Sequence, residues 1–562
     1  MTKYWLATTG ALALALSACG DTAEVDTVET VEFTLADISE ADLRRRIETL
    51  SDDAMEGRAP STPGGQRASQ YIADEMAAAG LAPMGDDGTY FQTVELTAAS
   101  VLPDSSFTIS NGDDVLVAGD QSTNLVAWTK RTDAQVSVTD SELVFVGYGI
   151  VAPEYGWNDY DGLDVEGKTV VMLVNDPGFA TQDETVFKGN AMTYYGRWTY
   201  KFEEAGRQGA DAAIVIHQTA PASYGWDVVS GSWTGEQYDL VRPDGGASRT
   251  AIESWVHEDQ AREMFAAAEL DFDALTTAAA TPDATPVAMG DLTFTALLNQ
   301  TVATTESRNV AGGIVGTTRP DEYVLYMAHW DHLGMNPDAA PGEDAIYNGA
   351  VDNATGTAAI IEIGEAFAET GAPDRSAIFV AVTAEESGLL GSAYYAERPL
   401  VPLENTVAGI NIDAILPVGV TTDVKVVGFG ASELEDRLGG ILAPRDMTIV
   451  PDPTPEAGYY YRSDHISLAK KGVPMLYADA GDTHAVKGRE YGETFGKDYT
   501  ADRYHKPADE YDSSWDLSGI AQMTEILFEL GYSIADSEDW PNWYDGTEFR
   551  ALRDDQRADA MP

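Results

Sequence analysis

The chain has 562 residues and carries 34 Lys and Arg against 93 Asp and Glu, a formal net charge of −59 at pH 7. Because one hydrophobic core stops growing at roughly 250–300 residues, this length predicts at least two folded domains. Nucleic-acid binding and docking on anionic lipid both depend on Lys and Arg, so the charge excludes nucleic acid as a general partner and disfavours such docking. A hydrophobic share of 44% argues against wholesale disorder.

The first 18 residues are typical of a signal peptide. Lys3 supplies a positive charge, and residues 4–16 are apolar but too few to span a bilayer. Residues 16–19 (LSAC) resemble the lipobox of bacterial lipoproteins, which implies cleavage before Cys19 and lipidation of that residue. The alternative is an ordinary signal peptide followed by a chance cysteine. Cys19 is the single cysteine, so no intramolecular disulfide can form.

The expected location follows from this leader. We expect a mature protein anchored by lipid in the cell envelope, and Gly20 after the cysteine favours the outer membrane. No later apolar run is long enough to predict a transmembrane helix.

The texture of the sequence changes several times along the mature chain. A spacer at 19–37 precedes the first segment of the main domain at 38–100, in which apolar residues recur at helical spacing. Residues 101–289 are predicted to be a β-rich insert, because short apolar runs alternate with turn residues. Strand, loop and helix patterns then alternate over 290–550, the second segment of the main domain, and the acidic tail at 551–562 is expected to fray.

The second segment of the main domain predicts an α/β fold. Its strands are mostly apolar and alternate with amphipathic helices, which indicates a mixed, largely parallel sheet flanked by helices on both faces. The strands are predicted at residues 323–328, 377–382, 407–412, 424–429 and 474–478. The helices are predicted at residues 354–369, 389–397, 433–442, 464–471 and 517–534. In the insert, one clear helix is predicted around 198–205, and a linker at 278–285 is expected to close it.

Histidine and carboxylate side chains follow the predicted strands directly. In such a sheet, ligands bind just beyond the carboxyl ends of the strands, so these side chains are expected to share one rim. Histidine and carboxylate ligands without cysteine suit zinc or another first-row divalent ion. His329, Glu385, Glu386 and Asp413 follow the strands in this way. Asp352 lies in the loop between the first two of these strands, at the start of a helix, and His505 adds another imidazole far downstream.

Five separated blocks make the pattern more specific. They are AHWDHLG at 328–334, NGAVDNATG at 348–356, AEESGLLGS at 384–392, RSDH at 462–465 and YHKPAD at 504–509. In this order they resemble the co-catalytic double-zinc aminopeptidase family, which includes bacterial leucyl aminopeptidase, glutamate carboxypeptidase, glutaminyl cyclase and the transferrin receptor. The insert resembles the protease-associated domain that several members carry. The resemblance implies the zinc-exopeptidase fold, with its phosphorylase/hydrolase-like sheet.

The resemblance also implies two zinc ions per chain, bridged by Asp352. His329 and Asp413 would complete the shell of one ion, and Glu386 and His505 that of the other. A carboxylate with two oxygens can hold two divalent ions about 3.5–4 Å apart with a hydroxide between them.

Further roles carry over by position. Glu385 would be the general base, which takes a proton from the water and passes it to the leaving amine. Asp331 would orient the imidazole of His329, and Tyr504 would donate a hydrogen bond to the developing oxyanion. Arg462 is a tentative substrate-binding residue, because a guanidinium can hold a terminal carboxylate.

Some residues in the motifs stay without a clear role. His332 and His465 are expected to be structural, and His484 lies in a Gly- and Asp-rich loop that could border the cleft. The family often has Met and Gly after the Asp that follows the third strand. That residue is Asp413 here, and Ala414 and Ile415 follow it. This difference puts the substrate preference in doubt, but not the metal centre.

The sequence therefore predicts a zinc-dependent exopeptidase that acts on peptides. An aminopeptidase is favoured, because acidic groups around the metals suit a free α-ammonium. A carboxypeptidase or dipeptidase of the same fold stays open through Arg462. An inactive binding protein that uses the insert, whose partner is unknown, is the alternative from another class, and glutaminyl cyclisation would need one zinc rather than two.

Overall fold

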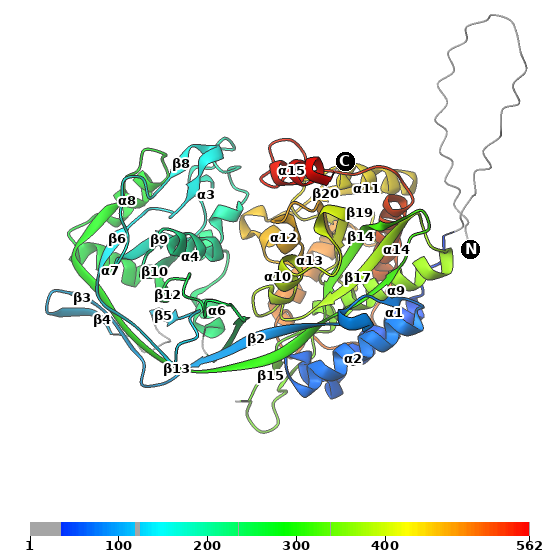
Figure 1. Ribbon diagram of the computed structural model, residues 1–562, viewed down its shortest axis with the longest axis horizontal. Helices are drawn as coiled ribbons and strands as arrows, with labels where there is room; N and C mark the ends of the chain where they lie inside the picture. Colours follow the sequence, from blue (N-terminus) through cyan, green and yellow to red (C-terminus); the bar gives the residue numbers. More distant parts are fainter. Residues whose placement is uncertain (1–34, 119–123, 234, 338, 561–562) are drawn as a thin grey trace, which may run out of the picture. The chain divides into compact units, whose positions relative to one another are not determined.

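Four parallel strands form the middle of the larger sheet in the computed structural model (Figure 1). In spatial order they are β17 (Arg375–Val382), β14 (Arg319–His329), β18 (Thr406–Asn411) and β21 (Met475–Ala480). Antiparallel strands flank them, namely β13 (Val287–Ile314) beside β17 and β19 (Asp423–Val426) beside β21, and β20 (Thr448–Pro451) follows β19. The predicted mixed, largely parallel sheet is confirmed.

The structure describes residues 35–118, 124–233, 235–337 and 339–560. The predicted signal peptide, Cys19 and nearly all of the spacer lie outside these ranges. Among the described residues, no helix combines the length and the apolar character needed to cross a bilayer.

Helices cover both faces of the larger sheet. On one face, α9 (Gly356–Thr370) and α14 (Ser518–Ala535) pack through aromatic rings. The centre of the Phe367 ring is 6.0 Å from that of Tyr326 and 5.3 Å from that of Phe528. On the other face, α10 (Leu390–Glu397) and α12 (His465–Ala469) share a core with Leu325 and Met327. Successive residues of a strand point to opposite faces, so burial on both sides explains the nearly continuous apolar runs of the sequence.

The N-terminal helices belong to the same domain as the larger sheet and its covering helices. The helix α1 (Glu40–Leu50) is capped by Ser39, whose hydroxyl accepts from the Asp42 N–H at 3.2 Å. It is followed by the short turn η1 (Asp53–Arg58) and by α2 (Pro63–Ala78), which begins with the cap Thr62. The apolar stripe of α1 faces inward, as its helical spacing predicts.

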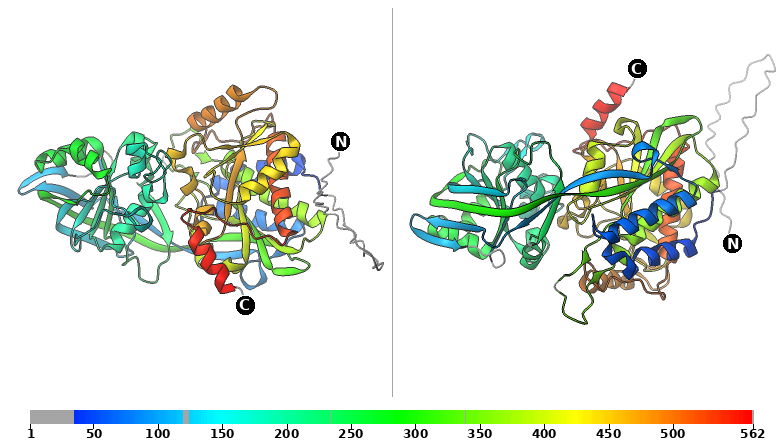
Figure 2. Two further views of the ribbon diagram at one scale, coloured as in Figure 1. Left: turned by 90° about the horizontal axis from the view of Figure 1, so that it is seen from above. Right: turned by 60° about the horizontal axis from the view of Figure 1, so that its bottom comes forward.

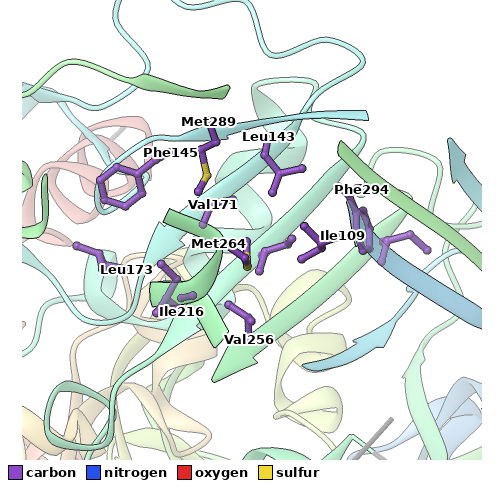
Figure 3. Close-up of a cluster of buried hydrophobic side chains, with 14 of the residues drawn as sticks. Ile109, Leu143, Phe145, Val171, Leu173, Ile216, Val256, Met264, Met289 and Phe294 are labelled. Carbon is purple, nitrogen blue, oxygen red and sulfur yellow. The ribbon is translucent and has the colours of Figure 1, made fainter. Parts of the chain in front are cut away.

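A second sheet builds the insert. Its central strands run parallel in the order β12, β10, β9, β6, and β5, β13, β3 and β4 continue it with antiparallel pairings. Their bounds are β3 (Ser106–Asn111), β4 (Asp114–Ala118), β5 (Leu125–Trp128), β6 (Gln135–Phe145), β9 (Thr169–Leu173), β10 (Ala212–His217) and β12 (Ile252–His257). Figure 3 shows the core beneath this sheet, where Phe145, Val171, Ile216 and Met264 lie together.

Helices are more numerous in the insert than the single predicted one. The predicted helix is present as α4 (Trp198–Arg207), and the structure adds α7 (Glu258–Ala267) and α8 (Phe272–Ala279). Side-chain caps start both added helices, because His257 accepts from the Asp259 N–H and Asp271 from the Ala274 N–H. These caps lie just before the two helices in the sequence, but the prediction did not include them.

One strand joins the two sheets. The first part of the 28-residue β13 pairs with β3 and β6 in the insert, and from Gln300 onward it pairs with β2 (Phe91–Val101) and then β17. The right-hand view of Figure 2 shows β2 and β13 running side by side. The predicted linker at 278–285 therefore does not separate the domains, because the end of α8 and the following turn still belong to the insert. The chain leaves the insert within a continuous ladder of hydrogen bonds, and the predicted boundary at 289/290 falls inside β13.

The C-terminal segment is a helix and not the frayed tail that was predicted. The helix α15 (Arg550–Ala560) buries Arg553, whose side chain is 1% exposed. Its guanidinium donates to the carbonyl of Thr406 at 2.7 Å and to that of Leu403 at 3.3 Å. The charge-rich composition of this segment predicts a solvated arginine. The sequence does not show which carbonyl acceptors the fold places around the side chain.

We expect Arg553→Ala to lower the free energy of unfolding by about 2 kcal/mol, because two buried carbonyls lose their donor. Chemical denaturation of the purified protein measures this change. Asp555→Ala, at an exposed position of the same helix, is the matched control and should stay within about 0.5 kcal/mol. Equal stability of both variants would contradict the docked helix.

Candidate metal centre

The carboxyl ends of three neighbouring strands deliver most of the predicted site. His329 is the last residue of β14, and Asp413 lies just beyond β18. Glu385 and Glu386 follow β17 after a short turn, and Asp352 lies in the turn η5 (Ala350–Thr355) that leads into α9. Because these strands are parallel, their carboxyl ends lie at one edge of the sheet, and the side chains converge there.

His505 comes from the other side of this edge. It follows α13 (Arg489–Asp502), a charge-rich helix that ends just before the last sequence block. Its side chain is 37% exposed, whereas the other candidate ligands are mostly or fully buried. The site is therefore open to solvent on the His505 side.

Asp352 stands between the two histidines. One of its oxygens, Oδ1, is 3.2 Å from His329 Nε2, and the other, Oδ2, is 3.2 Å from His505 Nε2. His329 Nε2 is also 3.2 Å from Asp413 Oδ1, and His505 Nε2 is 3.2 Å from Glu386 Oε2. The five predicted ligands thus form two groups that share the Asp352 carboxylate, as the predicted bridge requires.

The donor atoms fit a divalent cation. The ligand atoms of His329, Asp352 and Glu386 lie within 4.8 Å of one another, and those of His329, Glu385 and Asp413 do so as well. Imidazole nitrogens and carboxylate oxygens without a thiolate are a donor set that zinc accepts. Buried carboxylates at this spacing also repel one another unless a cation or protons compensate their charge.

The pKa values of these groups reflect that crowding. Burial alone would lower the pKa of His329, but Glu385, Asp413 and Asp352 outweigh it and raise the pKa well above its usual range. Burial raises the pKa of Glu385 well above its ordinary value, and Glu386 and Asp413 add to this rise although His329 opposes it. A carboxylate that binds a proton more readily than usual is suited to act as a general base.

Asp331 contacts both His329 and Glu385, but not as predicted. Its carboxylate lies 4.0 Å from His329 Nδ1, whereas its main-chain carbonyl is nearer to that nitrogen, at 3.2 Å. Its Oδ1 accepts the N–H of Glu385 at 3.1 Å. The carboxylate therefore holds the Glu385 backbone, and the carbonyl of Asp331 is the group placed to orient the imidazole.

Tyr504 and Arg462 lie at the edge of the cluster. The Tyr504 ring stacks on His505 with ring centres 3.9 Å apart. Burial raises the pKa of Tyr504 well above its usual range, while Arg462 opposes the rise, so the phenol keeps its proton and can donate it in a hydrogen bond. Arg462 packs 4.9 Å from the centre of the Tyr459 ring.

The insert reaches the same region. The Met192 N–H donates to the carbonyl of Pro455 at 3.1 Å, and Tyr194 OH accepts from Lys470 Nζ at 2.5 Å. Further along this segment, burial and then the positive charge of Arg462 lower the pKa of Arg197 to about 10. Among the described residues, Arg197 Nε has no hydrogen-bond partner.

Three further residues support the centre. Ser463 Oγ donates to Asp413 Oδ2 at 2.6 Å, and Asp509 accepts backbone N–H groups of the Asp352 turn. The fully buried Arg58 donates to the carbonyls of Trp330 and Gly349. Ser463 and Asp509 lie in two of the five sequence blocks and Arg58 lies outside them, and only the fold shows which groups these side chains meet.

The remaining motif histidines lie in distinct surroundings. His332 is buried with Nδ1 2.6 Å from Glu386 Oε1, so it touches a candidate ligand. His465 is fully buried beside the Tyr460 ring. His484 Nδ1 accepts hydrogen bonds from the N–H groups of Val486 and Lys487, so its side chain stabilises its own turn.

One segment of the chain matches a known family model. Residues 309–531 match the model of peptidase family M28, and this segment contains every predicted metal ligand.

Two curated relatives match a shorter stretch. An aminopeptidase NAALADL1 of Mus musculus is 37% identical over 139 residues, 23% of this chain and 17% of the relative. A probable zinc metalloprotease of Pyrenophora teres f. teres is 34% identical over 106 residues, 19% of this chain and 22% of the relative. The chain thus spans only about a fifth of the length of these relatives.

Similar solved structures extend over most of the chain. An aminopeptidase from Aneurinibacillus sp. strain AM-1 has a TM-score of 0.49 and 19% identity, covering 90% of this chain and 95% of its own. The zinc aminopeptidase BSAP from Bacillus subtilis has a TM-score of 0.39 and 16% identity, covering 91% and 97%.

We expect Asp352→Ala and Glu385→Ala to separate metal binding from proton transfer. Loss of Asp352 removes the carboxylate shared by both ligand groups and should release metal, whereas loss of Glu385 should leave the metal content of the wild type. Elemental analysis of the dialysed proteins measures this content. Equal metal loss in the two variants would contradict the assignment of ligand and base.

Proposed function

We propose that the protein is a zinc-dependent exopeptidase, most simply an aminopeptidase that releases N-terminal residues from peptides. The observation that carries this proposal is the Asp352 carboxylate, which faces His329 with one oxygen and His505 with the other, at 3.2 Å each. The match of residues 309–531 to peptidase family M28 supports the reaction class. The relatives named as an aminopeptidase and a zinc metalloprotease support the metal and the substrate class.

His329 and Asp413 would hold one zinc ion, Glu386 and His505 the other, and Asp352 both. Bound zinc supplies Lewis acidity, which polarises a peptide carbonyl and makes water a better nucleophile at neutral pH. A site that lacks a second ion would fit glutaminyl cyclisation better than peptide hydrolysis, so the zinc content per chain distinguishes these reactions.

The protein's own residues would move the proton. Glu385, whose pKa is raised, would accept a proton from the attacking water and deliver it to the leaving amine. Asp331 holds the backbone of Glu385 in place through the 3.1 Å hydrogen bond. The protonated Tyr504 would donate to the carbonyl oxygen as negative charge develops there.

The charge around the site bears on which end of a peptide enters. Acidic side chains beside the metal ligands favour a substrate α-ammonium, which supports the aminopeptidase. Arg462 and Arg197 favour a second candidate, a carboxypeptidase or dipeptidase. Neither guanidinium forms an ion pair with a carboxylate among the described residues, and a substrate carboxylate would supply one.

Peptides blocked at one end test which candidate is correct. For an aminopeptidase, N-acetylation should abolish hydrolysis of a short peptide, and amidation of its carboxyl end should change kcat/KM little. The reverse pattern would establish a carboxypeptidase, and sensitivity to both blocks a dipeptidase. Chromatography of the products with zinc supplied measures each rate.

The base variant controls for contaminating peptidases. Glu385→Ala should lower kcat by about 10²–10⁴-fold, because proton transfer by a positioned base contributes that much. Absence of hydrolysis in the wild type with two zinc ions bound would instead favour a binding protein that uses its insert.

We also propose that the mature protein is anchored in the cell envelope, in the outer membrane, through a lipid on Cys19. The LSAC sequence at residues 16–19 and the acidic spacer after it support this proposal. An anchor would keep the enzyme near peptides that cross the envelope.

Cys19→Ser should move the protein from the membrane fraction to the soluble fraction of the cells that produce it. Fractionation followed by immunoblotting measures the distribution, and mass spectrometry of the wild-type N-terminus detects the lipid. An unmodified Cys19 in the wild type would contradict the anchor.

A further inference from the structure

The turn that carries Asp352 does not provide hydrogen-bond acceptors for all of its own backbone N–H groups. Gly349 precedes it with a φ of 55°, and Asp352 has φ −104° and ψ 99°, so the helical pattern of η5 is interrupted. A Cβ on Gly349 would meet the Asp352 carbonyl oxygen at 2.2 Å, which leaves glycine as the residue that fits. The N–H groups of Val351 and Asp352 therefore need acceptors from another part of the chain.

Asp509 provides these acceptors. Its carboxylate is fully buried and accepts from the Val351 N–H at 3.2 Å and from the Asp352 N–H at 3.1 Å. Its own carbonyl accepts the Ala350 N–H at 2.9 Å. Three consecutive residues of the turn are thus held by this one residue.

Asp509 also lies on the segment that supplies the other side of the site. It is four residues after His505, so the same short stretch presents an imidazole to Asp352 Oδ2 and a carboxylate to the Asp352 backbone. Tyr499 of α13 donates its hydroxyl to Asp509 Oδ2 at 3.2 Å. The position of Asp352 relative to His505 is therefore set through Asp509.

We propose that Asp509 is a positioning residue for the metal centre, which fixes the Asp352 carboxylate so that its two oxygens face two different ions. This inference rests on the proposed function. Residues that orient ligands in this way typically contribute 10–100-fold in metal affinity. Arg58 also holds this turn, because it donates to the carbonyl of Gly349 at 2.8 Å.

A charge effect has to be separated from positioning, since Asp509 is a negative group near the ions. Asp509→Asn removes the charge and one acceptor oxygen. Asp509→Glu keeps the charge but moves the carboxylate by one methylene. If Asp509 positions Asp352, both variants should bind zinc about 10–100-fold more weakly than the wild type.

The measurement is the zinc dissociation constant, obtained by competition with a chromophoric chelator. The absorption spectrum of the cobalt-substituted protein gives a second readout, because it reports ligand geometry. We expect altered cobalt spectra for both Asp509 variants. Wild-type zinc affinity in Asp509→Glu would overturn the inference, since only the charge would then matter.

Glu435→Gln is the matched control. Glu435 is also a buried carboxylate that accepts backbone N–H groups, from Gly430 and Ala431 at 2.8–2.9 Å, but it contacts none of the candidate ligands. The Glu435→Gln variant should have a lower melting temperature and an unchanged zinc affinity. Equal loss of zinc affinity in this variant would show that general destabilisation explains the Asp509 result.

Tyr499→Phe decides the question if the Asp509 variants fail to fold. It removes one hydrogen bond to the carboxylate and should weaken zinc binding by about two- to tenfold. Unchanged affinity in this variant would then overturn the inference.

The wild type separates this inference from the proposed function. Zinc binding without hydrolysis would refute the peptidase and leave the role of Asp509 standing. A wild type that binds no zinc would overturn both.

Discussion

The structure depends on the gathering of several buried anions at one edge of a parallel sheet. Asp352, Glu385, Glu386 and Asp413 cannot all be ionised so close together and so little exposed without compensation. Two histidines reach the cluster from opposite sides, and cations would complete the balance. The parallel order of β17, β14 and β18 is what makes the gathering possible, because it brings three carboxyl ends to the same edge.

The loops at this edge are held in conformations that the chain would not adopt alone. Ala384, Ala414 and His505 have φ values of 54°, 60° and 56°, a region that residues with side chains disfavour. Such strain persists only where the surroundings enforce it. Buried polar residues do so here: Arg58 and Asp509 hold the turn before and within η5, and Asp331 holds Glu385.

The insert is more closely integrated than a separate module would be. Its sheet and the larger sheet share β13, so the backbone hydrogen bonding along this strand continues from one sheet into the other. The segment that leads to α4 contacts loops of the larger sheet through Met192 and Tyr194. Under the proposed function, Arg197 is the residue of the insert that would help to hold a substrate carboxylate.

The sequence alone predicted most elements of the larger sheet and the candidate ligands that the fold brings together. Apolar runs and helical spacing predicted the strands and helices, the residues after three strands predicted four of the donors, and the resemblance to a family added Asp352, His505 and the roles of the ligands. The continuity of β13, the helix α15 and the contacts of Asp331 and Asp509 depended on the tertiary structure. Each of them rests on backbone groups far away in the sequence, such as the Thr406 carbonyl that Arg553 binds. Residue types reveal which side chains can donate or accept, but only folding decides which unpaired N–H or carbonyl they meet.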